Sequence, residues 1–220
     1  VMTSVGKARE LGIDPAKWVF LHGCGEANEK ILVSERVDYH SSPAMAANTS
    51  SAFEMAGKRI DDMDYIDIYS CFPSAVEIGC DELGLRYDDP RGLTVTGGLP
   101  FFGGPGNNYS MHAIATMLPL LRAAPSKFGL VTENGGYLSK HATGIYSATA
   151  TKGRWRRESP ATYQADIDKM ASPEFIETPS GKASVETYTV CCKRGIPQRG
   201  IIIGRLHGSD QRFVANTPDD

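Results

Sequence analysis

The sequence lacks both a long apolar run and an excess of positive charge. Nowhere in its 220 residues does an apolar run approach the roughly 18 residues that a membrane-spanning helix needs. Lysine and arginine total 23 against 26 aspartates and glutamates, a formal net charge of −3, and no basic stripe or tail is present. We therefore expect neither a membrane nor nucleic acid as a partner. The first residues also lack the basic-then-apolar order of a secretory signal, so we expect a cytoplasmic protein.

The cysteines also lack a disulfide pattern. The five cysteines are an odd number without the spacing of a small disulfide-stapled domain, which favours free thiols in a reducing compartment. We expect no metal site.

Strand-like and helix-like segments alternate through the first 150 residues. Ser42 and Pro43 form a favourable helix start, and Gly57 is a typical helix stop. A second helix should end at Gly84, and Pro119 should kink or shorten a third helix at residues 110–122. Apolar runs predict strands at residues 18–21, 65–69, 127–132 and 143–150, the first of them ending at residues 22–25. This order is typical of an α/β layer architecture.

The composition changes near residue 151. Residues 151–174 are polar and interrupted by prolines, which predicts a linker with one short helix. The remainder alternates like strands, with "GIPQRG" (residues 195–200) as a hairpin turn. Ile201, Ile202 and Ile203 imply either burial on both faces or an apolar face that covers residues outside this sequence. We therefore expect an α/β domain at residues 1–150, followed at 151–220 by a linker and a small β-rich unit, such as an incomplete barrel.

A glycine-rich loop precedes the third helix. Residues 94–108 read "TVTGGLPFFGGPGNN" and contain five glycines. Such a loop either lets a helix pack close to a strand or presents backbone N–H groups to a polar ligand. It matches neither a phosphate-binding P-loop nor a dinucleotide fingerprint.

Two further loops carry reactive side chains. In "YSCF" (residues 69–72), Cys71 is either a nucleophile at a helix start or a small buried apolar residue. In residues 132–144, Asn134 and His141 are candidate ligands, and the alternative for His141, as for Glu133 and Lys140, is a solvated loop charge. His112 and His141 are also weak catalytic candidates, because histidine titrates near neutral pH.

The order of these three loops resembles the C-terminal half of the thiolase superfamily. The similarity covers residues 1 to about 150 and is greatest to thiolases of the sterol-carrier-protein type and to their thiolase-like relatives, often labelled acetyl-CoA acetyltransferases. It implies a mixed five-stranded sheet flanked by helices, with the β-rich unit added at the C-terminal end. It also implies that the three loops meet at a site for a CoA thioester, which would be a substrate or ligand and not a covalently bound cofactor. The site residues that it implies are Tyr69, Ser70, Gly97, Gly98, Gly103, Gly104, Asn134, Gly135 and Gly136.

The sequence departs from this family at its reactive positions. Tyr69 and Ser70 stand where the family has an Asn-Glu or His-Asp pair. Gly104 stands where it has the histidine of Gly-His-Pro, and Asn134 where it has an acid/base cysteine. The acylated cysteine belongs to the N-terminal half of such proteins, and no cysteine here matches it.

Two functional hypotheses follow from the resemblance. The first is the C-terminal half of an acyl-CoA acyltransferase of lipid metabolism, similar to acetyl-CoA acetyltransferases, whose partners are acyl-CoA and the N-terminal thiolase half. This chain alone would then be inactive. The second is a non-catalytic thiolase-like subunit that binds CoA thioesters or scaffolds a partner enzyme, as a homodimer or with another subunit. A standalone α/β binding module unrelated to thiolases would leave the order of the three loops to chance.

Overall fold

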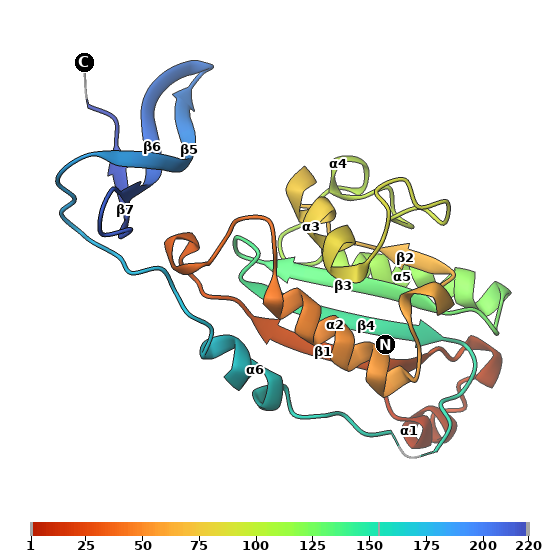
Figure 1. Ribbon diagram of the computed structural model, residues 1–220. Helices are drawn as coiled ribbons and strands as arrows, with labels where there is room; N and C mark the ends of the chain where they lie inside the picture. The colour runs from red at the N-terminus through yellow and green to blue at the C-terminus, as the bar shows by residue number, and fades with distance from the viewer. Residues whose placement is uncertain (1, 154, 219–220) are drawn as a thin grey trace. The chain divides into compact units, whose positions relative to one another are not determined.

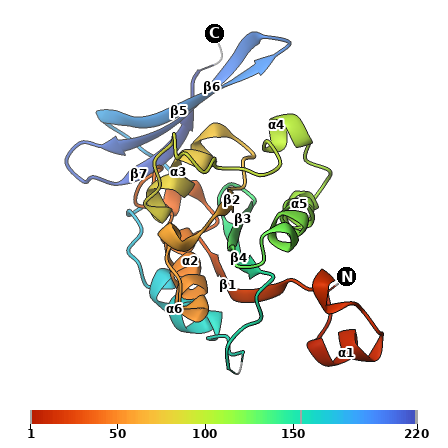
Figure 2. The same ribbon diagram turned by 90° about the vertical axis from the view of Figure 1, so that its right-hand side faces the viewer.

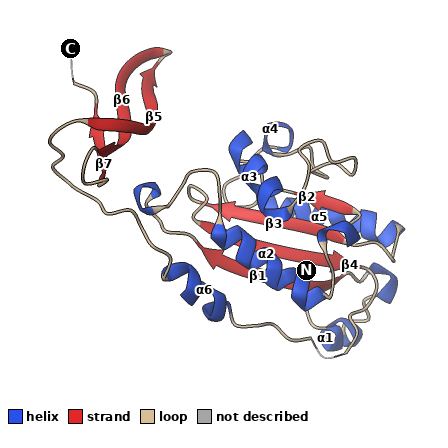
Figure 3. Cartoon of the chain, viewed as in Figure 1, coloured by secondary structure: helices blue, strands red, loops and turns tan. Residues whose placement is uncertain are grey.

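The computed structural model describes residues 2–153 and 155–218, which form two compact units. Unit 1 comprises Val1–Glu29 and His40–Asp168, and unit 2 comprises Lys30–Tyr39 and Lys169–Asp220. Figure 1 follows the chain through its elements, and Figure 3 separates helices from strands. Unit 1 extends past residue 150 because helix α6 (Pro160–Asp168) packs on the first strand and on helix α2 (Pro43–Ala56).

Unit 1 is built on a mixed sheet with the strand order β1-β4-β3-β2. Its strands are β1 (Phe20–Asn28), β2 (Tyr65–Asp67), β3 (Gly129–Gly135) and β4 (Lys140–Ser147). Only β2 and β3 are parallel. The described part of the sheet has four strands, where the family resemblance implied five. Beside β2, Ile68 donates a backbone hydrogen bond to Leu93 at 2.9 Å, but the chain then turns toward a buried carboxylate and forms no strand.

Helices cover both faces of this sheet (Figure 2). Helices α2 and α3 (Pro73–Leu83) enclose a core with Ile66, Leu130 and Ile145. Helix α5 (Tyr109–Ala123) packs on the other face against Val131. The unit also contains two short helices, α1 (Val5–Glu10) and α4 (Leu99–Phe102), and two 3-10 turns, Pro15–Lys17 and Ile60–Asp62.

Local capping explains where the helices begin and end. Ser42 caps α2 by accepting from the backbone of Met45, and Gly57 ends it in the left-handed conformation, as predicted. Gly84 ends α3 in the same way. Pro119 does not end α5 early, and both it and Ala115, whose carbonyl loses its helical partner, are exposed residues.

The first strand is longer than predicted, because Gly23 and Gly25 belong to β1 and do not end it. A Cβ atom on Gly23 would lie 1.9 Å from the backbone oxygen of Ala52, and one on Gly25 would lie 2.1 Å from that of Asn48. Helix α2 therefore lies directly on the backbone of β1, which only glycine permits.

Unit 2 contains an antiparallel sheet of β5 (Ala183–Lys193), β6 (Ile196–Leu206) and β7 (Arg212–Asn216). The predicted turn is wrong in position: the hairpin turns at Arg194 and Gly195, both with positive φ, and Pro197 lies within β6. Pro197 is tolerated there because it pairs with Cys192 beside a β-bulge. Ile201, Ile202 and Ile203 are only half-buried, in contrast to the expected burial on both faces.

A buried arginine holds unit 2 together. Arg212 is fully buried and forms an ion pair with Glu186 at 2.7 Å. Its guanidinium also donates to the backbone oxygens of Ser34, Arg36 and Val37. These bonds join the segment Lys30–Tyr39 to the sheet, and that segment contains the 3-10 turn Val33–Glu35. This pairing lowers the pKa of Glu186 to about 2.

Candidate functional site

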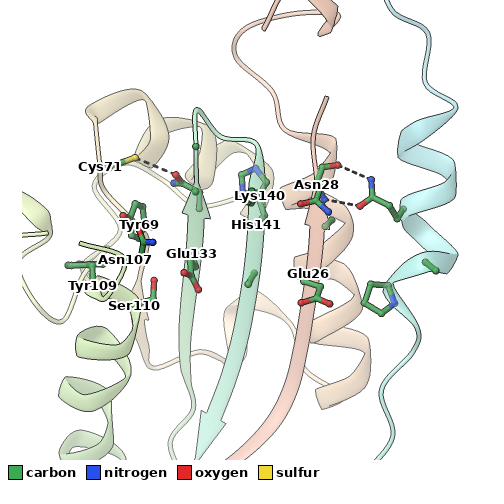
Figure 4. A pocket seen from close by; sticks show the side chains of 18 residues that line it. Glu26, Asn28, Tyr69, Cys71, Asn107, Tyr109, Ser110, Glu133, Lys140 and His141 are labelled. Carbon is green, nitrogen blue, oxygen red and sulfur yellow. Dashed lines mark hydrogen bonds between the residues drawn. The ribbon is translucent and has the colours of Figure 1, made fainter. Parts of the chain in front are cut away.

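A pocket of about 660 Å³ lies in unit 1 where the carboxyl ends of β2 and β3 meet the first turn of α5 (Figure 4). Open α/β sheets place ligand sites at this edge. Six of the site residues predicted from the sequence line the pocket, namely Tyr69, Cys71, Asn134, Gly135, Gly136 and His141. The structure thus brings together two of the three predicted loops.

The glycine loop reaches the pocket only through its last residues. Asn107, Tyr109 and Ser110 line it, whereas Gly97, Gly98, Gly103, Gly104 and His112 do not. Ser70 also lies outside the lining, where it accepts a hydrogen bond from the backbone of Leu99 at 3.0 Å. The short helix α4 accounts for this arrangement, because it inserts a turn between Gly98 and Gly103.

A buried carboxylate shapes the glycine loop. Asp67 is fully buried at the end of β2. One of its oxygens accepts from the hydroxyls and backbone N–H groups of the loop start, and the other accepts from the Tyr109 hydroxyl at 3.0 Å. Both ends of the loop are therefore fixed by one side chain. Sequence analysis missed this residue, although a charged residue inside the apolar run "YIDIY" was a usable signal.

Cys71 and Asn134 contact each other across the two loops. The Cys71 thiol donates to Oδ1 of Asn134 at 3.4 Å (Figure 4). Desolvation raises the pKa of the Cys71 thiol, and the backbone N–H groups of Cys71 and Phe72 offset only part of that rise. Because the net shift is upward, the thiol is protonated near neutral pH.

His141 is held in one tautomer from behind the pocket. Its Nε2 lies 3.1 Å from the Ser42 hydroxyl and 3.2 Å from the Leu138 carbonyl oxygen, which can only accept. Ser42 gives its own proton to Glu29 at 3.0 Å, so it accepts from the imidazole. Nε2 consequently carries a proton. Glu29 and Ser42 could not be identified from sequence, because nothing local links them to His141.

Two lining residues carry buried polar atoms without a partner among the residues that the structure describes. They are the Ser110 hydroxyl and Nδ2 of Asn134, and the two residues are 8% and 4% exposed. Buried polar groups normally form hydrogen bonds, so unsatisfied ones at the wall of a pocket indicate where a ligand atom can bind.

The charges around the pocket have both signs. Glu26, Glu133 and Lys140 line it, and Glu26 is paired with Arg157 at 3.0 Å. Within residues 2–153 and 155–218, no three His, Cys, Asp or Glu side chains are grouped so as to hold a metal ion. The five cysteines are free thiols. None of the described helices is long and apolar enough to cross a membrane.

Comparisons with known proteins place the chain in a family. None of the curated proteins matches it. Residues 162–220 match the family model described as the additional C-terminal domain of thiolase-like protein type 1. The crystal structure of a monomeric SCP2-thiolase-like protein type 1 from Mycobacterium smegmatis is similar, with a TM-score of 0.91 and 44% sequence identity. The match covers 99% of this chain and 48% of that protein, so the chain spans about half its length. The chain belongs to the SCP2-thiolase-like family of thiolase-like proteins.

Proposed function

We propose that the protein binds CoA thioesters, with the thioester group in the pocket between β3 and the first turn of α5. The observation that carries this proposal is the pair of buried polar groups on Ser110 and Asn134 that line the pocket without partners in the described chain. A thioester offers a carbonyl oxygen that accepts hydrogen bonds, which is what an amide N–H and a hydroxyl can satisfy. The family relationship supports this class of ligand.

We further propose that binding occurs without the Claisen condensation of thiolases. That reaction needs a thiolate nucleophile and a group that shuttles protons. Asn134 cannot titrate near neutral pH, Gly104 carries no side chain and lies outside the pocket, and Cys71 remains a protonated thiol. The bound thioester would thus be held and not activated by these residues.

Acyl transfer by the whole protein is the second candidate, because Cys71 and His141 line the same pocket. The nucleophile of such a reaction would have to come from residues outside this chain. A non-catalytic subunit that presents CoA thioesters to a partner enzyme needs no such residue and agrees better with the protonated thiol.

Calorimetric titration of the protein with acetyl-CoA tests the proposal. Replacing Asn134 by leucine removes the amide at similar volume and should weaken binding about fivefold to tenfold. Asn216→Ala, on an exposed position of β7, is the control and should leave the affinity unchanged. Thermal unfolding of each variant checks that it is folded. If acetyl-CoA and acetoacetyl-CoA both fail to bind, the proposal is wrong. Consumption of acetoacetyl-CoA with free CoA that disappears in Cys71→Ala would show that Cys71 is a nucleophile after all.

A further inference from the structure

The first turn of α5 offers hydrogen-bond donors to the pocket. Asn108 occupies the N-cap position of this 15-residue helix, but its side chain makes no capping hydrogen bond. The Asn108 amide instead contacts Nε2 of His112 at 3.0 Å. The N–H groups at the start of a helix have no intrahelical acceptor, and together they form a partially positive end. Without a cap, these groups stay available to a ligand.

Ser110 supplies a second and independent indication of a ligand at this place. It lies in the first turn of α5 and lines the pocket, where its hydroxyl faces the space between α5 and β3 (Figure 4). Although the residue is only 8% exposed, its oxygen has no hydrogen-bond partner in the described part of the chain. A buried hydroxyl is rarely left unsatisfied, so a ligand oxygen at this position would complete its bonding.

Asp67 keeps this turn in place. Tyr109, the residue before Ser110, is 2% exposed, and its hydroxyl donates a hydrogen bond to Asp67 at 3.0 Å. Desolvation raises the pKa of Tyr109, so its hydroxyl remains a donor throughout the neutral range. The first turn of α5 is thereby fixed to the end of β2 by a buried hydrogen bond.

The charges around the pocket decide which kind of oxygen fits. Helix N–H groups and a hydroxyl can donate hydrogen bonds either to a carboxylate or to a carbonyl oxygen. Glu133 and Glu26 line the same pocket, and Lys140 and Arg157, the ion-pair partner of Glu26, balance them, so these charges give no net attraction for an anion. A neutral carbonyl oxygen uses the same donors and needs no countercharge.

We infer that Ser110 and the first turn of α5 bind the carbonyl oxygen of the thioester. This inference rests on the proposed function and adds to it the part of the pocket that recognises the acyl group. Ser110 is then the residue that distinguishes a thioester from a CoA derivative without a carbonyl, and Asp67 positions the turn that carries it.

Titrations with two ligands test the inference. Acetyl-CoA carries the carbonyl oxygen, and S-ethyl-CoA replaces that carbonyl by a methylene group. In the native protein, acetyl-CoA should bind about fivefold more tightly, as expected for one neutral hydrogen bond. Ser110→Ala should weaken the binding of acetyl-CoA by about that factor and leave the binding of S-ethyl-CoA unchanged. Ser110→Cys, which has a weaker donor of similar size, should give an intermediate loss of affinity for acetyl-CoA.

Ser74 provides a matched control. It occupies the same position in the first turn of α3 as Ser110 does in α5, but it is exposed and lies outside the pocket. Ser74→Ala should therefore leave both affinities unchanged. If the native protein binds the two ligands equally, or if Ser110→Ala weakens both by the same factor, the inference is wrong while CoA binding stands. If neither ligand binds, the proposed function fails and the inference fails with it.

Discussion

Replacement of Asp67 should release the glycine loop and destabilise unit 1. Asp67 accepts hydrogen bonds from the Thr94, Thr96 and Tyr109 hydroxyls and from the backbone N–H groups of Val95 and Thr96. Asp67→Ala removes both carboxylate oxygens, which accept all of these bonds, from a fully buried position. The hydroxyls can turn toward one another, since Thr96 and Tyr109 already lie 2.6 Å apart, but the Val95 N–H cannot.

The magnitude follows from what each variant leaves unpaired. A buried donor without an acceptor costs about 1–3 kcal/mol, and a cavity is added, so we expect Asp67→Ala to lower the free energy of unfolding by about 3–5 kcal/mol. Asp67→Asn keeps the shape. Its amide oxygen can face Val95 and Thr96 while its NH₂ group donates to the Tyr109 oxygen, so we expect a loss of only about 1–2 kcal/mol from the missing charge.

Urea unfolding measures these free energies, and hydrogen exchange of the Val95 and Thr96 amides locates the effect. Both amides should exchange faster in Asp67→Ala than in Asp67→Asn. Asp61→Ala, at an exposed aspartate nearby, is the control and should change stability by less than about 0.5 kcal/mol. Equal losses in the two Asp67 variants, or a loss below about 1 kcal/mol in Asp67→Ala, would refute the view that this carboxylate organises the loop.

Three further predictions concern other parts of the chain. The pKa of Glu186 is lowered from 4.5 to about 2, so its ionised form stabilises unit 2 above pH 4.5. The free energy of unfolding should fall by up to about 3 kcal/mol as the pH falls from 4.5 toward 2. Unfolding of Glu186→Gln should depend less on pH over that range. Gly25→Ala would place a Cβ 2.1 Å from a backbone oxygen of α2, so it should lower the free energy of unfolding, measured by heating, by about 3 kcal/mol. The new Cβ in Gly6→Ala would meet only a side-chain oxygen at 3.9 Å, so this variant should be neutral or slightly stabilising. The exposed thiol of Cys192 should react quickly with a disulfide reagent in the native state. Cys80 is buried and its thiol has a pKa of about 11, so it should react only after unfolding. Rapid labelling of Cys80 would contradict its placement in the core.

Sequence reasoning succeeded where the determinant of structure was local. The bounds of α2 were predicted because Ser42 and Gly57 act within one turn of the helix that they limit. The end of α3 at Gly84 was predicted for the same reason. The extent of β1 was not, because Gly23 and Gly25 resemble a loop until it is known that a helix lies against them.

The candidate site was predicted in part for a comparable reason. Strand ends that share one edge of a sheet bring Cys71 and Asn134 together, and their side-chain atoms lie 3.4 Å apart. Gly103 and Gly104 were expected in the same group, but α4 separates them from the pocket, and a four-residue helix within a glycine-rich loop leaves little sequence signal. Ser110 was missed because its significance lies in a missing partner, which only coordinates reveal.

The hydrogen bonds of Asp67 bear on whether the shape of the glycine loop depends on the residues at its tip. If the glycine loop took its conformation from a bound ligand, replacing the residues at its tip would cost both binding and structure. Here the loop is fixed at its two ends, by the Asp67 bonds to Thr94 and to Tyr109, and its tip at Gly103 and Gly104 lies outside the pocket. The tip can therefore vary without disturbing the first turn of α5, where Ser110 lines the pocket. Under the proposed function, ligand recognition would then depend on the end of the loop that joins α5 and not on its tip.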